Sequence, residues 1–142
     1  DVYKRQVLSF WLLAFSIFIF FSLALVKRYT ELFDLQLLGK EAPKGRGYQV
    51  SDLAILNSMG TGSGYMAVLI LALYINSPEV ETMYSFPELI WLLCPLLLYW
   101  ISRVWFLVQR GKMDADPVLF AIKDDTSLLI GACTMAILLI AI

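Results

Sequence analysis

Long apolar runs alternate with short polar stretches along the whole chain. The apolar runs cover about residues 7–26, 53–75, 88–110 and 126–142. The first contains no charged side chain, and at about 1.5 Å per residue a helix of this length crosses a hydrocarbon layer of roughly 30 Å. A helix also satisfies its own backbone hydrogen bonds in lipid. The pattern therefore predicts an all-α, integral membrane helical bundle with four transmembrane helices.

Local signals mark where the first two helices begin and end. No helix breaker occurs between residue 26 and Gly39, so the first helix could continue beyond the bilayer through KRYTELFD. Ser51 and Asp52 are suitable N-caps for the second helix. Residues 1–6, DVYKRQ, are polar and lack a signal-peptide cleavage site. We expect them to be a non-native or poorly ordered leader in front of a transmembrane domain at 7–142.

The third and fourth helices have equally clear local signals. Pro87 suits a first helical position and starts the third helix, which is expected to kink near Pro95. The fourth helix begins at about Thr126, with Asp124 and Asp125 placed favourably against its N-terminal dipole. It runs apolar to the last residue without a closing polar anchor. We therefore expect the native protein to continue beyond residue 142. We also expect earlier membrane segments, which would make this chain a piece from the C-terminal part of a longer protein, a C-terminal fragment.

The composition agrees with a membrane protein and restricts the chemistry. Hydrophobic residues make up 60% of the chain and charged residues only 16%, below the roughly one quarter that is usual in soluble domains. There is no histidine, which excludes histidine-based catalysis and histidine-ligated zinc. Metal chemistry would need oxygen ligands, which favours magnesium or manganese. Cys94 and Cys133 fall within apolar runs and are interpreted as packing residues.

The distribution of basic residues predicts the orientation in the membrane. Lysines and arginines gather in the stretch between the first two helices and in the stretch between the last two, whereas the middle connection has none. Because positive loops stay on the cytoplasmic side, residues 27–52 and 111–125 are predicted to face the cytoplasm. The chain would then be a multi-pass protein of the inner (plasma) membrane.

Two arginines near the end of the third helix are candidates for binding phosphate. Arg103 and Arg110 are seven residues apart and lie on roughly the same helix face. Arg103 would lie roughly 10 Å deeper than Arg110. An unpaired guanidinium at that depth is unfavourable, so we expect Arg103 to contact a substrate phosphate or a carboxylate rather than lipid. The alternative is an arginine that snorkels to the surface and only anchors the helix.

A second charged group follows the first apolar run. Lys27, Glu31 and Asp34 share one helix face, with Arg28 beside Glu31. They are either solvated ion pairs at the end of a membrane helix or a polyphosphate or metal site at the membrane surface. The following loop, 39–48, carries three basic residues between glycines and could close over an anion, although it lacks the Walker spacing.

The second helix contains a motif of small residues. Gly60 and Gly64 form a GxxxG pair, which is typical of a close helix contact and could support a homo-oligomer. The alternative function of this face is a groove for a lipid chain.

Three segments together resemble a known superfamily. They are KRYTEL after a membrane helix, RGY in the loop that follows, and LYWISRVWFLVQRGKMDADPVLFAIKD at the next cytoplasmic edge. On these segments the chain resembles the UbiA-like prenyltransferase superfamily, nearest its decaprenyl-phosphate phosphoribosyltransferase branch. The resemblance implies a bundle of about nine membrane helices, of which this chain would supply the last four. The first acidic motif of the superfamily, NDxxDxxxD, is absent, and the second is represented only by Glu31 and Asp34.

The resemblance implies an integral membrane transferase that acts on a polyprenyl (di)phosphate at the cytoplasmic face, with Mg²⁺ assisting phosphate binding. Its partners would be a polyprenyl lipid substrate and the membrane, with no nucleic acid. In this interpretation, phosphate would be bound by Lys27, Arg28, Arg46, Tyr48, Arg103 and Arg110. The metal would be bound by Glu31, Asp34, Asp114 and Asp116. The alternative is a non-enzymatic membrane scaffold or transporter subunit, in which Arg103 lines a path or pairs with a carboxylate.

Overall fold

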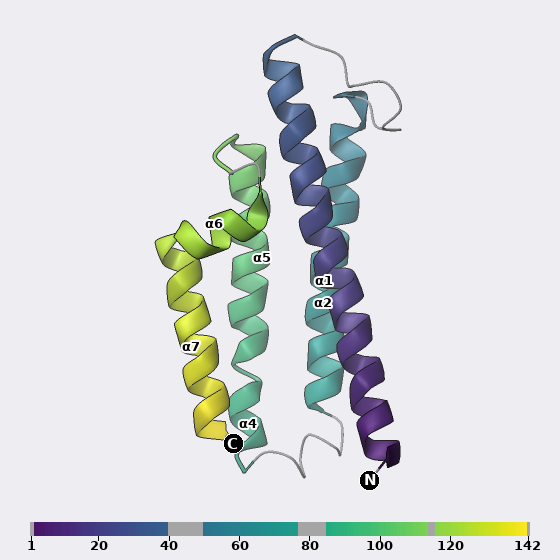
Figure 1. Cartoon of the computed structure of the whole chain (residues 1–142), viewed down its shortest axis with the longest axis vertical. Helices are drawn as coiled ribbons and strands as arrows, with labels where there is room; N and C mark the ends of the chain where they lie inside the picture. The colour runs from purple at the N-terminus through teal and green to yellow at the C-terminus, as the bar shows by residue number, and fades with distance from the viewer. Residues whose placement is uncertain (1, 40–49, 77–84, 114–115, 142) are drawn as a thin grey trace.

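The computed structural model describes residues 2–39, 50–76, 85–113 and 116–141, and every regular element in these ranges is helical (Figure 1). The elements are α1 (Val2–Leu37), the short 3₁₀ turn η1 (Val50–Asp52), α2 (Leu53–Ile75), α4 (Pro87–Ile90), α5 (Leu93–Gln109), α6 (Pro117–Lys123) and α7 (Asp125–Ala141).

The helices are long and apolar enough for a membrane protein. By length and composition, Phe10–Leu37, Leu53–Ile75 and Glu88–Gln109 could each cross a bilayer. A fourth span results only if α6 and α7, which are bent by 79° relative to each other, are taken as one broken span. The predicted all-α architecture of apolar helices is therefore confirmed, with three or up to four candidate spans.

Helix α1 is longer than its apolar run. It includes residues 2–6, which the sequence predicts to be poorly ordered, and it continues past residue 26 to Leu37. Extending an existing helix adds a hydrogen bond for each residue ordered, so flanking helix formers join it readily. The chain leaves the helix at Gly39, whose φ of 70° is a conformation that favours glycine. Gly39 therefore ends α1 as the sequence predicts.

The third predicted helix is interrupted close to the expected kink. Helices α4 and α5 are separated by Trp91 and Leu92, four and three residues before Pro95. Proline has no N–H group to bond the carbonyl oxygen four residues earlier, which here belongs to Trp91. That oxygen accepts a hydrogen bond from the Cys94 amide instead, at 3.2 Å. The break is thus a direct result of Pro95.

The helices form a bundle with one polar end. Helices α1 and α2 run side by side, α5 packs against α2, and α7 packs against α5 (Figure 1). The end of α1, the start of α2, the end of α5 and the crossing helix α6 lie toward the same end of the bundle (Figure 1). At the opposite end, the Phe86 amide donates to the Ala141 carbonyl oxygen at 3.1 Å. The bundle thus brings the described parts of the two predicted cytoplasmic stretches toward one end.

A tryptophan of α5 joins three helices in the core. Trp105 is only 3% exposed, and its ring lies directly over Gly60 of α2. Its Nε1–H donates to Ser22 Oγ of α1 at 3.1 Å, and Ser22 Oγ donates to the Gly60 carbonyl oxygen at 2.6 Å. Gly64, one turn further along α2, packs against Ile101 of α5. The GxxxG pair therefore makes the predicted close helix contact, but within a single chain.

This packing affects the two other roles considered for the GxxxG face. Gly60 and Gly64 are both buried, and Trp105 and Ile101 fill the space above them. A second copy of the chain or a lipid chain could reach this face only by displacing α5.

Two alanine substitutions on α2 are predicted to change stability in opposite directions. A Cβ on Gly60 would overlap the Trp105 ring, so Gly60→Ala should lower the free energy of unfolding by about 1–3 kcal/mol. A Cβ on Gly62, on the same helix, would have no neighbouring atom within 4 Å, so Gly62→Ala should raise it by up to about 1 kcal/mol. Unfolding of both variants in detergent micelles measures the difference. Equal effects would show that Trp105 does not pack on α2.

Candidate functional site

Arg103 forms a two-pronged ion pair with Asp124. Nη1 of Arg103 lies 3.0 Å from Oδ2 of Asp124, and Nη2 lies 3.2 Å from Oδ1. The side chains are only 25% and 16% exposed, so this pair is better shielded from water than a surface salt bridge. The Phe120 ring lies 5.8 Å from the guanidinium carbon, within the range of a cation–π contact. The structure thus gives Arg103 a carboxylate partner, one of the two contacts that the sequence predicts.

Asp124 reaches Arg103 because it forms the corner between α6 and α7. Its backbone is extended, with φ −75° and ψ 125°, which separates the two helices. Its Oδ2 accepts a hydrogen bond from the Ser127 amide at 2.9 Å, the usual geometry of an N-cap. The favourable placement of Asp124 at the start of α7 is therefore confirmed. Its pairing with Arg103 was not predicted, although the expected need for a carboxylate was the signal that could have led to it.

A chain of hydrogen bonds extends from this ion pair into α5. Ser127 Oγ donates to Asp124 Oδ2 at 2.9 Å, and Nε1–H of Trp100 donates to Ser127 Oγ at 2.8 Å. We call Trp100, Arg103, Asp124 and Ser127 the Arg103 network. It connects one turn of α5 to the first turn of α7 and satisfies a buried hydroxyl, an indole N–H and a carboxylate together.

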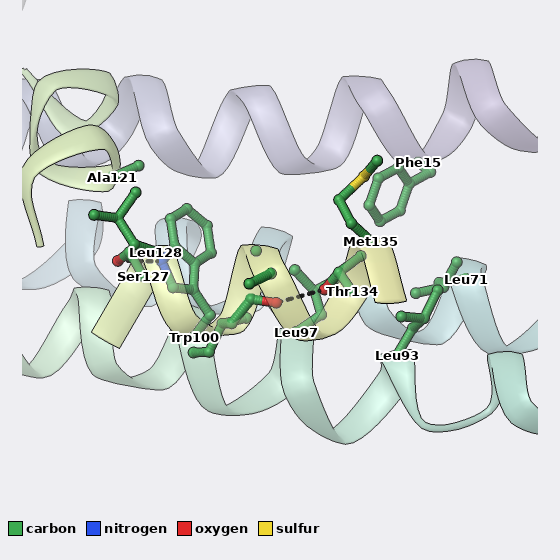
Figure 2. Close-up of a pocket in the computed structure, with 13 residues that line it drawn as sticks. Phe15, Leu71, Leu93, Leu97, Trp100, Ala121, Ser127, Leu128, Thr134 and Met135 are labelled. Carbon is green, nitrogen blue, oxygen red and sulfur yellow. Dashed lines mark hydrogen bonds between the residues drawn. The ribbon is translucent and has the colours of Figure 1, made fainter. Parts of the chain in front are cut away.

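An apolar cavity of about 720 Å³ adjoins the Arg103 network (Figure 2). We call it the α7 cavity, because about half of its lining residues come from that helix. Trp100, Ala121 and Ser127 line the end near α6, and Phe15, Leu93 and Met135 lie toward the other end (Figure 2). These two groups are separated along α7 by roughly 12 Å, the rise between Ser127 and Met135. Its size and mostly apolar wall are typical of a small-molecule site.

The charged residues of α1 form a local pair at the polar end. Arg28 Nη1 lies 3.0 Å from Glu31 Oε2, and both side chains are about one third exposed, at 36% and 31%. Lys27 and Asp34 are exposed. An exposed pair three residues apart on a helix stabilises it by only a few tenths of a kcal/mol, about 0.2–0.5. The Arg28–Glu31 pair agrees with the first of the two interpretations of the spacing, and the residues remain accessible to a ligand.

The remaining candidates are only partly described. Arg110 is exposed and its guanidinium carbon lies 5.5 Å from the Phe106 ring of its own helix. Asp116 caps α6, since its Oδ1 accepts from the Val118 amide at 2.9 Å. Arg46, Tyr48 and Asp114 lie outside the described residues.

The carboxylates assigned to a metal do not form a cluster in the part of the chain that the structure describes. No group of three or more histidine, cysteine, aspartate or glutamate side chains is close enough there to hold an ion. Glu31 pairs with Arg28, and Asp116 bonds a backbone amide. The predicted metal ligands that the structure describes, Glu31, Asp34 and Asp116, are therefore not brought together as one cluster.

Comparisons with known proteins place the chain beside two rhizobial proteins. It is 35% identical over 135 residues to the uncharacterized protein y4nM of Sinorhizobium fredii, covering 93% of this chain and 26% of that protein. It is 37% identical over 119 residues to the nodulation protein NoeC of Azorhizobium caulinodans, covering 82% of this chain and 38% of that protein. The chain thus spans well under half the length of either relative. No protein-family model and no solved structure matches it.

Removing the charge of Asp124 is predicted to destabilise the α6–α7 corner. Asp124→Asn leaves the Arg103 guanidinium without its counter-charge and should lower the free energy of unfolding by about 2–3 kcal/mol. The control is Asp125→Asn, one residue further along the chain and exposed. It should cost less than about 1 kcal/mol, because only an interaction with the helix dipole is lost. Thermal unfolding in micelles compares the two, and similar losses would argue against the ion pair.

Proposed function

We propose that the protein is an integral membrane transferase, or the part of one, that acts on a polyprenyl phosphate or diphosphate. The observation that carries the proposal is the position of the Arg103 network next to the α7 cavity. A polyprenyl phosphate has an apolar chain and an anionic head. The structure has an apolar cavity, and Ser127 in its wall is hydrogen-bonded to Asp124, the partner of the Arg103 guanidinium. The resemblance of the KRYTEL and DPVLFAIKD segments to prenyltransferases supports the same ligand class.

Arg103 can bind a phosphate while it keeps its carboxylate partner. A guanidinium carries five N–H donors, and the two hydrogen bonds to Asp124 use one on each terminal nitrogen. The other donors have no hydrogen-bond partner among the described residues. Asp124 fixes the plane of the guanidinium, and a fixed fork loses little entropy when it binds an oxyanion. The ion pair therefore prepares Arg103 for a phosphate.

Other basic groups at the polar end would attract the phosphate and hold its further charges. Lys27 and Arg110 are exposed there, and Arg28 is about one third exposed. Clustered positive charge raises the local concentration of anions and speeds their association. Arg46 and Tyr48 belong to the same proposed set on the basis of the resemblance.

In a transfer reaction these cations would stabilise charge rather than form covalent bonds. Negative charge develops on phosphate oxygens as a leaving group departs, and fixed donors in a site shielded from water stabilise that charge. The α7 cavity would hold the chain so that its phosphate stays at the polar end. Magnesium is proposed from the resemblance alone, and it would supply further charge neutralisation at the phosphates.

We also propose that the polar end faces the cytoplasm, in an inner (plasma) membrane. The support is the number of lysines and arginines in residues 27–52 and 111–125, together with the absence of any in the connection between α2 and α4. The helix ends that border these basic stretches lie toward one end of the bundle (Figure 1), which is consistent with a single membrane orientation.

A non-enzymatic membrane subunit is the second candidate, and the ion pair itself favours it. A bundle that only needs to hold α5 and α7 together would also pair Arg103 with Asp124. The two functions differ in what they require of residue 103. A structural pair needs a positive charge, whereas a phosphate site needs the planar fork.

Arg103→Lys is predicted to weaken phosphate binding while the fold is kept. The lysine retains a single ion pair with Asp124 but loses two-pronged contact with an oxyanion, so the affinity for farnesyl phosphate should fall about tenfold or more. The affinity for farnesol, which has no phosphate, should change less than about twofold. Both are measured by calorimetric titration of the purified protein at a fixed detergent concentration.

The control for this experiment is Lys123→Gln, which removes an exposed positive charge at the same corner. It should lower farnesyl phosphate affinity less than about threefold, because an exposed charge is screened by salt. If Arg103→Lys binds farnesyl phosphate as tightly as the unsubstituted protein, Arg103 is not a phosphate ligand, and the structural subunit becomes the better explanation.

A further inference from the structure

Two hydroxyl groups line the α7 cavity, and they are used differently. Thr134 Oγ1 donates to the Ile130 carbonyl oxygen of its own helix at 2.9 Å, so its hydrogen bond is local (Figure 2). Ser127 Oγ bonds Trp100 of α5 on one side and Asp124 on the other. Only Ser127 therefore links the cavity wall to the ion pair of Arg103.

The direction of these hydrogen bonds is fixed by their chemistry. An indole N–H can only donate, so the Trp100 ring must donate to Ser127 Oγ. The single hydroxyl hydrogen of Ser127 is then directed to Asp124 Oδ2, the same oxygen that accepts from Arg103 Nη1. The hydrogen bonds from Trp100 to Ser127 and from Ser127 to Asp124 run in one direction, so these two polarise and strengthen each other, most of all where water is absent.

The Trp100 ring is the part of this series of hydrogen bonds that a ligand in the α7 cavity would contact. It belongs to the cavity wall and is only partly buried within the chain. An apolar chain packed against the indole would exclude water from it and strengthen the Trp100–Ser127 hydrogen bond. Asp124, and with it the guanidinium of Arg103, would be held more firmly. Because coupling between two sites is reciprocal, a phosphate on Arg103 would favour the chain in the cavity by the same factor.

We propose that Trp100 and Ser127 are positioning residues that couple the α7 cavity to Arg103. The isoprenoid chain and the phosphate of one ligand then bind cooperatively. The binding free energy of the whole ligand is therefore more favourable than the sum of the binding free energies of an isoprenoid alcohol and a free phosphate. This inference rests on the proposed function, since it requires a polyprenyl phosphate as the ligand. It assigns roles to two residues on the cavity wall that need not touch the phosphate.

The test compares two variants of the cavity wall. For each variant it measures how much more tightly the protein binds an isoprenoid when the isoprenoid carries a phosphate, which we call the gain. This gain is the Kd for farnesol divided by the Kd for farnesyl phosphate, measured on the same variant. Ser127→Ala removes the link between Trp100 and Asp124 but keeps the backbone amide that Asp124 accepts from. The gain should fall about threefold to tenfold, corresponding to the loss of one coupled hydrogen bond. Thr134→Val removes the other hydroxyl of the wall and should change the gain less than about twofold.

A rescue variant separates coupling from a general loss of stability. Ser127→Thr keeps a hydroxyl at this position of the cavity wall and should keep the gain. If Ser127→Ala binds farnesyl phosphate with an unchanged gain, the coupling is absent, while the proposed function stands. If the unsubstituted protein binds neither farnesol nor farnesyl phosphate, the proposed function and the coupling both fail.

Discussion

The need to pair one guanidinium inside an otherwise apolar helix determines much of this structure. Arg103 lies among apolar residues of α5, where an unpaired charge is strongly unfavourable. Asp124 supplies the counter-charge, and it can do so only because the chain turns sharply between α6 and α7. The same carboxylate caps α7 and accepts the hydroxyl of Ser127. One ion pair therefore fixes the position of α7 against α5, and with it the end of the α7 cavity that is nearest to α6.

Helix α5 is joined by side-chain hydrogen bonds to α1, α2 and the start of α7. Polar side chains along its last three turns find partners on three neighbours. Trp100 and Arg103 bond residues at the start of α7, Trp105 bonds α1, and Ser102 and Gln109 lie within hydrogen-bond distance of α2 residues. Hydrogen bonds between apolar helices contribute modestly, about 0.6 kcal/mol on average, but they are directional. Several of them on one helix specify how the bundle is assembled, while the surrounding apolar contacts supply the packing.

The elements of the fold were largely predictable because their signals are local. Apolar runs predict the long helices, Gly39 ends α1, and Pro95 interrupts the third span through a missing N–H group. The need for a partner at Arg103 was also predictable from the unfavourable energy of a buried charge. The identity of that partner was not, because it depends on the 79° bend between α6 and α7, and such an angle follows from packing rather than from residue spacing. The α7 cavity has the same origin, since side chains from several helices line it.

In the function proposed above, one amphipathic ligand occupies the α7 cavity with its phosphate beside Arg103. Photolabelling can test this placement with a farnesyl phosphate that carries a diazirine on the isoprene unit nearest the phosphate. After irradiation and digestion, labels are expected on Trp100 and on α7 near Ser127, and unlabelled farnesyl phosphate should remove them. Labels only on exposed apolar residues such as Phe10 and Phe20 of α1, unaffected by the competitor, would contradict it.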